Sequence, residues 1–315
     1  MNDAAPVEAR GLVKRYGEIV AVDHVDLNVE RGDVYGYLGP NGAGKTTSLR
    51  MLLGLIRPTA GSARLFGRDP LLEGAKALDG VAGFVEGPRF YPYLSGRKNL
   101  MLLADYDTPN SRSHIDEVLE LVELRDRAKD RVGGYSHGMR QRLGIAASLL
   151  RQPRLLLLDE PTTGLDPAGM RDMRDLVRRL AGEGITIVLS SHILAEVEDL
   201  CNRVAIIRKG SVIYQGSLSE LMATAASGYR LRAVEPDRAR AVLLTHAGVE
   251  DVELRDGELR FKADEQAVAA LSVALGQARI AFTALVPESA SLEDLFLGMT
   301  GGESADHDRQ AAVAL

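Results

Sequence analysis

The sequence predicts an α/β fold with a largely parallel sheet and a helical insertion, followed by a smaller α+β domain. Strand patterns alternate with helical patterns over residues 6–218, an order typical of parallel sheets in which helices connect the strands. Beyond residue 218 the order changes to one compact set of strands and helices. A chain of 315 residues is long enough for two domains of ordinary size.

Composition and charge exclude several classes of protein. Hydrophobic residues make up 45% and charged residues 26% of the chain, which is ordinary for a globular protein. The net charge of −6 argues against a domain that coats nucleic acid, so we expect no direct nucleic-acid binding. The one cysteine, Cys201, cannot form an internal disulfide. No apolar run approaches the ~18 residues of a membrane helix, and no signal-peptide pattern opens the sequence, so we expect a cytoplasmic chain.

The sequence pattern over residues 1–218 predicts one domain, with a helical subdomain inserted at about residues 87–153. Strand patterns occur at Val7–Val13, Val20–Val29, Val34–Leu38, Leu155–Leu158, Ile185–Leu189, Val204–Arg208 and Ser211–Tyr214. Helical patterns occur at Thr46–Ile56, Asp116–Glu123, Met139–Leu150 and Arg171–Leu180.

Residues 219–300 predict a separate accessory domain. Strand patterns occur at Tyr229–Ala233, Val249–Leu254, Glu258–Ala263 and Ile280–Val286, and helical patterns at Pro236–His246 and Glu265–Ala278. The resulting order, β-α-β-β-α-β, is that of a ferredoxin-like α+β domain. Residues 301–315 are small and polar, and we expect a disordered tail there.

A glycine-rich loop lies between a predicted strand and a predicted helix. It reads Gly39-Pro40-Asn41-Gly42-Ala43-Gly44-Lys45-Thr46, followed by Thr47, and fits the phosphate-loop (Walker A) pattern G-x-x-x-x-G-K-[ST] of P-loop NTPases. Its glycines allow backbone N–H groups to point at phosphate oxygens, and the helix N-terminus adds partial positive charge. In such a loop Lys45 neutralises the β- and γ-phosphates and the Thr46 hydroxyl binds Mg²⁺. The loop therefore predicts a nucleoside triphosphate and Mg²⁺ as ligands.

Two acidic residues, Asp159 and Glu160, end the leucine run Leu155–Leu158. Four consecutive apolar residues suit a central strand that is buried on both faces. Carboxylates at its end carry an electrostatic cost that a metal ion and a reacting water would offset. We therefore expect Asp159 to hold Mg²⁺ and Glu160 to polarise the attacking water. The alternative is an acidic pair that stabilises the N-terminus of a following helix.

Further motifs, in the same order along residues 6–218, make the chain similar to the ATP-binding subunits of ATP-binding-cassette (ABC) transporters. Tyr135-Ser136-His137-Gly138-Met139 stands where that family has its signature, Leu-Ser-Gly-Gly-Gln. Ser136 and Gly138 keep the pattern, and the other three residues depart from it. The resemblance implies that Ser136, Gly138 and the following helix face the γ-phosphate of ATP. A simple N-capped amphipathic helix would explain the same residues.

The resemblance implies roles for three more residues. Asp166, within Pro161–Pro167, looks like part of the family's D-loop and would face a partner subunit. His192 follows a predicted strand where the family has its switch histidine, and it would contact the γ-phosphate and the attacking water. Tyr16 fits the aromatic residue that stacks on adenine, and an ordinary strand tyrosine explains it equally well.

Glu86 stands where the family normally has glutamine. This residue and the following stretch, Phe90–Gly96, are similar to the subgroup of bacitracin-resistance and lantibiotic-immunity exporters. The resemblance implies that Glu86 senses the nucleotide as a ligand of Mg²⁺ or of an ordered water. The alternative is a solvated loop carboxylate without a role.

The resemblance also implies how the protein works. Ser136 and Asp166 make sense if two copies meet, so we expect a head-to-tail homodimer with two ATP molecules in its interface. Hydrolysis by Glu160, with His192 and Mg²⁺, would separate the copies, and the Glu86–Ser95 loop would transmit this motion to a separate integral membrane permease. The protein would then be the ATP-hydrolysing subunit of an ABC exporter at the inner face of the cell membrane. Its cargo would be a peptide antibiotic, another drug or a lipid.

Two other classes of phosphate-loop protein fit parts of the sequence. A soluble ABC-type ATPase that acts on ribosomes or DNA would share the motifs. Such relatives typically carry two cassettes or a long coiled-coil insertion, and neither is found in this sequence. A phosphate-loop kinase would leave the signature helix and His192 as coincidences. The soluble ATPase therefore remains the alternative to the exporter subunit.

Overall fold

The computed structural model describes residues 4–106, 111–225, 228–255, 257–288 and 292–300. The chain divides into two compact units, residues 1–218 and 219–315. Each unit has its own core of buried apolar side chains. Residues 301–315, for which we expect a disordered tail, lie outside the described residues.

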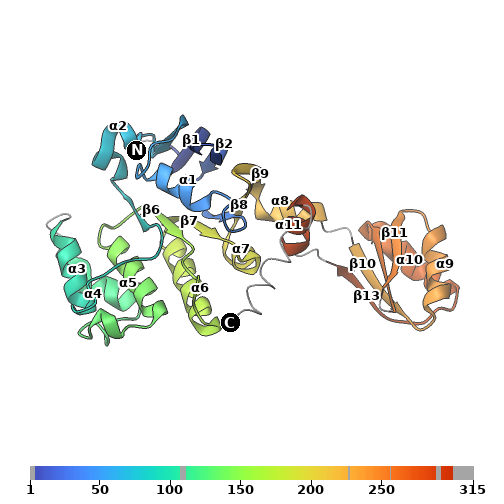
Figure 1. Ribbon diagram of the computed structural model, residues 1–315. Helices are drawn as coiled ribbons and strands as arrows, with labels where there is room; N and C mark the ends of the chain where they lie inside the picture. Colours follow the sequence, from blue (N-terminus) through green and yellow to red (C-terminus); the bar gives the residue numbers. More distant parts are fainter. Residues whose placement is uncertain (1–3, 107–110, 226–227, 256, 289–291, 301–315) are drawn as a thin grey trace. The chain divides into compact units, whose positions relative to one another are not determined.

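A six-stranded sheet forms the centre of the first unit (Figure 1). Its strands, in spatial order, are β5 (Val81–Phe84), β6 (Leu155–Asp159), β7 (Thr186–Ser191), β3 (Val34–Leu38), β8 (Arg203–Arg208) and β9 (Ser211–Ser217). All neighbours are parallel except β8 and β9. Every residue of β3, β6 and β7 is buried, as expected for strands covered on both faces. The carboxyl ends of these three strands meet at one edge, where open parallel sheets bind ligands.

The first two strands form a second, antiparallel sheet and do not join the parallel one. Its order is β2 (Ile19–Val29), β1 (Val7–Tyr16) and β4 (Ala60–Leu65). Buried and less buried residues alternate over much of β2, which is the pattern of a strand with one covered face. Strand β4 has no β-branched residue, and its sequence carried no strand signal.

The helices of the first unit are α1 (Lys45–Leu52), α2 (Pro70–Glu73), α3 (Gly96–Asp105), α4 (Ile115–Leu121), α5 (His137–Leu149), α6 (Pro167–Gly182) and α7 (Leu194–Leu200). Helix α1 ends at Leu52 and not at the predicted Ile56, because Gly54 turns the chain with φ 69°. Figure 1 shows α3, α4 and α5 gathered beside the sheet, within the segment where the inserted helical part was predicted. No helix in the described part of the chain is long and apolar enough to cross a membrane.

The second unit contains a four-stranded antiparallel sheet in the order β11-β12-β10-β13. Its elements are α8 (Leu218–Ala225), β10 (Gly228–Ala233), α9 (Pro236–Thr245), β11 (Val249–Arg255), β12 (Glu258–Ala263), α10 (Glu265–Gln277), β13 (Phe282–Glu288) and α11 (Leu292–Thr300). Apolar side chains of α9 and α10, including Leu243 and Leu271, pack against Leu231, Leu259 and Phe261 of the sheet. These two helices therefore cover one face of it.

Candidate functional site

The glycine-rich loop connects β3 to α1 at the carboxyl edge of the parallel sheet. Gly42 and Gly44 have φ values of 77° and 105°, which glycine adopts most readily. A Cβ at Gly39 would overlap the carbonyl oxygen of Ile207, and one at Gly44 would overlap that of Ala21. The loop therefore needs these glycines to adopt its path, and its backbone N–H groups at the start of α1 suit an anion.

Lys45, the first residue of α1, has a side chain that is only 4% exposed. Its Nζ donates to the carbonyl oxygens of Gly39 at 2.7 Å and Pro40 at 3.2 Å. The same Nζ lies 3.2 Å from Oε1 of Glu160. A buried ammonium requires such partners, and here they include the loop that would surround a phosphate.

Asp159 lies at the end of β6, directly beside Thr46. The Thr46 hydroxyl donates to Oδ2 of Asp159 at 2.9 Å, and the Ser190 hydroxyl donates to Oδ1 at 2.5 Å. The backbone N–H of Glu86 reaches Oδ2 at 3.4 Å. Among the described residues, no group of three or more His, Cys, Asp or Glu residues could hold a metal by itself. A hydroxyl and one carboxylate nevertheless suit Mg²⁺, which keeps several waters and binds substrate phosphates.

Glu160 follows with φ 48°, a conformation that non-glycine residues rarely adopt. Its backbone N–H donates to the hydroxyl of Ser190 at 3.0 Å. Its carboxylate accepts from the Thr163 hydroxyl at 2.9 Å and lies 3.3 Å from Nδ1 of His192. The adjacent imidazole of His192 lowers the pKa of Glu160 most, Thr163 and Lys45 lower it further, and burial opposes them. The resulting pKa is about 2.

The backbone N–H of Glu86 lies at the carboxyl edge of the sheet, beside Asp159, but the Glu86 carboxylate points away from Asp159. The side chain forms an ion pair with Arg50 of α1 and is more than half exposed. Glu86 has φ 62°, so the chain turns sharply where β5 leaves the sheet. The structure thus places the N–H of Glu86, and not its carboxylate, on Asp159.

Tyr16 ends β1, and 49% of this residue is exposed. The ammonium of Lys14 lies 5.0 Å from the centre of this ring. Tyr16 pairs with Ile19 across the turn into β2, and Ala21, two residues further along β2, abuts Gly44. The exposed ring therefore belongs to a hairpin that touches the phosphate loop.

Ser136, Gly138 and Asp166 do not contact the phosphate loop through any interaction within the described ranges. Ser136 caps α5, and its hydroxyl accepts from the backbone N–H of Met139 at 3.2 Å. Asp166 caps α6 in the same way, accepting from Gly169 at 2.9 Å. A single copy therefore brings together Gly39–Thr47, Asp159, Glu160 and His192, while Ser136, Gly138 and Asp166 belong to other surfaces of it.

Three contacts of the site were not anticipated from the sequence. Ser190 bridges Asp159 and Glu160, and Thr163 binds the Glu160 carboxylate. His137 brings its imidazole within 2.9 Å of the Thr163 carbonyl oxygen. The signal for Ser190 was present, since a polar residue ending a buried strand beside the Asp159 strand must find a partner there.

Comparison with known proteins gives one matching family model, described as ABC transporter, over residues 22–163. The bacitracin transport ATP-binding protein BcrA of Bacillus licheniformis is 40% identical over 298 residues, which cover 94% of this chain and 97% of that protein. The daunorubicin/doxorubicin resistance ATP-binding protein DrrA of Streptomyces peucetius is 38% identical over 98% of this chain and 96% of its own length.

Solved structures share the fold of most of this chain. An ATP-binding subunit of an ABC transporter is 27% identical and superposes with a TM-score of 0.62 over 69% of this chain and 92% of that chain. The dimeric ATP-binding cassette MJ0796 bound to ADP and Pi is 25% identical, with a TM-score of 0.60 over 67% of this chain and 98% of its own.

Proposed function

This chain belongs to the family of ABC transporter ATP-binding proteins, and we propose that it is the ATP-hydrolysing subunit of an exporter whose permease is a separate membrane protein. Members of this family bind and hydrolyse ATP to drive transport, and the chain is such an ATPase. The observation that carries the proposal is the contact of Lys45 and Thr46 with Glu160 and Asp159. It joins a phosphate loop to a pair of acidic residues in one site.

ATP would bind with its phosphates in the loop of Gly39–Thr47. The backbone N–H groups of the loop and the Lys45 ammonium would neutralise the β- and γ-phosphates. Support for Tyr16 as the adenine platform comes from its exposed ring and from the contact between its hairpin and Gly44. Lys14 lies close to the same ring and would add positive charge beside the nucleotide.

Mg²⁺ would be held by the Thr46 hydroxyl and the Asp159 carboxylate, together with phosphate oxygens and water. When bound, the metal would supply charge neutralisation on the transferring phosphoryl group. Ser190 orients Asp159 from the opposite side, through its hydrogen bond to Oδ1. Glu86 would join as a metal or water ligand after its carboxylate leaves Arg50.

Glu160 would act as the general base. A water attacks the γ-phosphorus, the bond to the β-phosphate oxygen breaks, and the water proton passes to the Glu160 carboxylate. The low pKa keeps this carboxylate ionised at neutral pH. When the γ-phosphate attracts Lys45 away from Glu160, the pKa of Glu160 rises and its basicity increases. His192, 3.3 Å from the same carboxylate, would position the water and contact the γ-phosphate.

Two copies would enclose two ATP molecules. Ser136, Gly138 and Asp166 lie away from the phosphate loop of their own chain, and each copy has one set of them. A two-fold, head-to-tail dimer places the Ser136 helix of one copy over the γ-phosphate of the other. The solved cassette MJ0796 is described as dimeric with ADP and Pi, which supports such an arrangement here.

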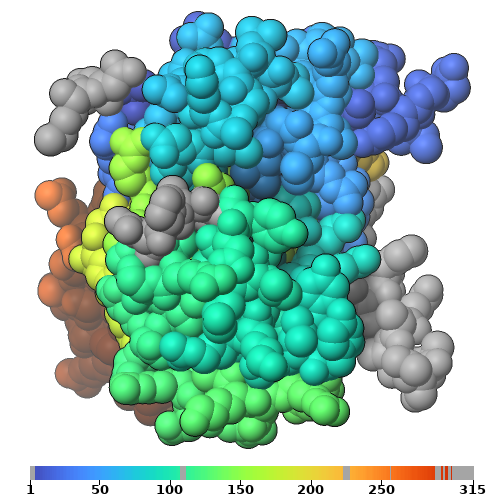
Figure 2. All heavy atoms as spheres, turned by 90° about the vertical axis from the view of Figure 1, so that its left-hand side faces the viewer, coloured from blue at the N-terminus to red at the C-terminus, as the bar shows by residue number. Residues whose placement is uncertain are grey.

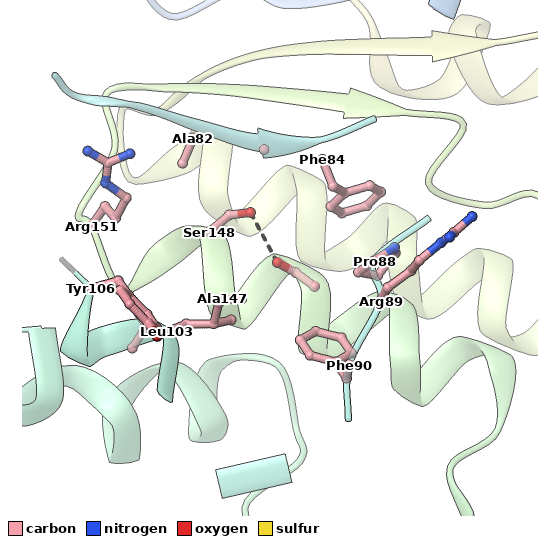
Figure 3. Close-up of a pocket in the computed structure, with 13 residues that line it drawn as sticks. Ala82, Phe84, Pro88, Arg89, Phe90, Leu103, Tyr106, Ala147, Ser148 and Arg151 are labelled. Atoms are coloured by element: carbon pink, nitrogen blue, oxygen red, sulfur yellow. Dashed lines mark hydrogen bonds between the residues drawn. The ribbon is translucent and has the colours of Figure 1, made fainter. Parts of the chain in front are cut away.

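The permease would bind where the segment after β5 meets α3 and α5. A cavity of about 460 Å³ lies there, with Phe84, Pro88 and Phe90 around it and Ala147 of α5 on its wall (Figure 3). The surrounding surface carries exposed apolar side chains: Tyr91, Tyr93, Leu102, Leu103 and Tyr106. Figure 2 shows the side of the molecule that carries the α3–α5 segment, whose teal and green atoms cover the lower part of the view. Exposed apolar clusters of this kind mark binding surfaces for other proteins.

A segment of the permease would lie on the Glu86–Ser95 loop. This loop would therefore transmit the change between the ATP-bound and nucleotide-free states to the permease. Glu86 touches the Asp159 carboxylate through its backbone N–H, while Phe90, four residues later, lines the cavity. A shift of Glu86 on nucleotide binding would move the cavity wall. The cargo would be a peptide antibiotic, another drug or a lipid, and the names of the bacitracin and daunorubicin relatives favour an antibiotic or drug. The subunit would then work at the inner face of the cell membrane.

We assign residues 1–218 to the cassette, about 87–153 to its helical subdomain and 219–300 to an accessory domain. The sheet order β11-β12-β10-β13, with α9 following β10 and α10 following β12 along the chain, supports a ferredoxin-like type for the accessory domain.

Affinity purification tests the exporter proposal. The bait is Glu160→Gln, captured from detergent-solubilised native membranes with ATP and Mg²⁺, and the captured proteins are identified by mass spectrometry. The matched control adds Tyr93→Asp and Leu103→Asp, both at exposed positions of the proposed permease surface. Recovery of a multi-span membrane protein with the bait but not with the control supports the proposal. Recovery of ribosomal or DNA-repair proteins without a permease favours the soluble ATPase.

A further inference from the structure

His137 joins two segments of the first unit that carry different parts of the site. It is the first residue of α5, directly after the cap Ser136. Its Nε2 lies 2.9 Å from the carbonyl oxygen of Thr163, a normal distance for an N–H···O hydrogen bond. Because a carbonyl oxygen only accepts, the Nε2–H of the imidazole is the donor.

Thr163 continues this connection to Glu160. Its hydroxyl donates to Oε2 of Glu160 at 2.9 Å, and its backbone N–H donates to the Glu160 carbonyl oxygen at 3.2 Å. The imidazole of His137 thus holds the backbone carbonyl of Thr163, and the hydroxyl of Thr163 holds the carboxylate of Glu160, the proposed base. An unbroken series of hydrogen bonds runs from the start of α5 to Glu160.

The surrounding packing holds the two segments in register. Gly164 has φ 76°, and a Cβ on it would lie 3.4 Å from Nε2 of His137. Leu165 lies beside Gly138, where an added Cβ would be 3.5 Å from the leucine methyl. The loop after β6 and the first turn of α5 therefore meet over two successive pairs of residues.

A histidine at position 137 makes this contact possible, because the usual signature residue there, glycine, has no side chain. We propose that His137 is a positioning residue that links the Ser136 end of α5 to Thr163, and through it to Glu160. The proposal rests on the two-fold arrangement proposed above, in which Ser136 serves the partner's ATP while Glu160 serves the ATP of its own chain. Closure of α5 onto the partner's γ-phosphate would then set the orientation of Glu160, so that hydrolysis in one site depends on occupancy of the other.

The test compares His137→Ala with His137→Gln, whose amide N–H can replace the imidazole donor. ATP hydrolysis is measured in the full chain as a function of ATP concentration. His137→Ala should lower kcat by roughly 3- to 10-fold, the range expected for one lost hydrogen bond, and bring the Hill coefficient close to one. The affinity of an isolated copy for ADP should not change, since His137 does not touch the phosphate loop. His137→Gln should recover most of the kcat and the cooperativity.

A double-mutant cycle with Thr163→Val, which removes only the hydroxyl, tests whether the two contacts act in series. If they do, the double variant His137→Ala/Thr163→Val should lose little more kcat than Thr163→Val alone. Thr163→Ser, which keeps the hydroxyl, is the control. Additive losses, or His137→Ala with the parent's kcat and Hill coefficient, would overturn the proposal. A parent chain without ATPase activity, or a Glu160→Gln chain that stays monomeric with ATP and Mg²⁺, would instead contradict the proposed function.

Discussion

The ammonium of Lys45 lies 3.2 Å from the carboxylate of Glu160, so the side chain proposed to hold the γ-phosphate contacts the side chain proposed to activate the water that attacks it. Both lie at the carboxyl edge of the parallel sheet: Lys45 begins α1, after the loop that follows β3, and Glu160 directly follows β6. A phosphate bound at Lys45 would compete with Glu160 for this ammonium. Nucleotide binding would therefore convert Glu160 from an ion-pair partner into a free base.

Replacing Lys45 should weaken nucleotide binding strongly. Lys45→Met keeps the buried aliphatic stem and removes the charge. The loss of charge-assisted hydrogen bonds to phosphate should weaken ADP binding by roughly 10- to 100-fold. Isothermal titration calorimetry measures this directly. Lys98→Met, at an exposed position of α3, is the control and should bind ADP like the parent, whereas tight binding by Lys45→Met would contradict the assigned role.

The lowered pKa of Glu160 predicts how pH affects stability. Its folded-state pKa of about 2 lies below the ordinary value of 4.5. The ionised carboxylate therefore stabilises the fold fully above about pH 4.5, and this contribution is lost as the pH falls towards 2. The parent should be more stable than Glu160→Gln by about 1–2 kcal/mol at pH 7, and by less at pH 3.5.

Urea denaturation at the two pH values, followed by circular dichroism, checks this expectation. A stability difference between parent and variant that does not change with pH would mean that His192, Thr163 and Lys45 do not hold Glu160 in solution.

Two glycines of the loop should respond differently to alanine. Gly39→Ala places a Cβ against the backbone carbonyl of Ile207, which cannot move without distorting β8. Gly42→Ala meets no atom within 4 Å and costs only the left-handed backbone, about 1 kcal/mol. Thermal unfolding should therefore show a larger loss for Gly39→Ala. Equal losses at the two positions would argue against the loop geometry.

The ion pair between Arg50 and Glu86 should oppose metal binding by Glu86. An exposed pair of this kind is worth at most about 1 kcal/mol, or roughly 5-fold in an equilibrium constant. Arg50→Gln should lower the Mg²⁺ concentration for half-maximal ATPase activity by up to that factor, and Glu86→Ala should raise it. If neither variant changes the Mg²⁺ requirement, the solvated-carboxylate interpretation of Glu86 is correct.

Five of the six strands of the parallel sheet, and α1, α4, α5 and α6, could be predicted because periodicity is local, whereas β5, α2, α3 and α7 were not predicted. The leucine run of β6 is buried along its whole length, as its composition indicated. The separation of β1 and β2 into their own sheet depends on pairing with β4, which lies beyond α1 in the sequence. No local pattern records that pairing.

The contacts of the site likewise include some that the sequence predicts and some that depend on tertiary packing. Lys45, Thr46, Asp159 and Glu160 could be placed together because a loop and a strand end of known type must share one sheet edge. The contact between His137 and Thr163 could not, because it depends on where α5 meets the loop after β6. The ion pair between Glu86 and Arg50 could not be predicted either, because it depends on the rotamers of both side chains.

ATP hydrolysis by Glu160→Gln tests the central claim most directly. Glutamine keeps the size of the side chain and cannot accept a proton as a carboxylate does. The account predicts that the variant still binds ATP, loses turnover by roughly 100-fold or more, and forms a stable dimer with ATP and Mg²⁺ in size-exclusion chromatography with light scattering. Hydrolysis at the parent's rate would show that Glu160 is not the base and would contradict the account.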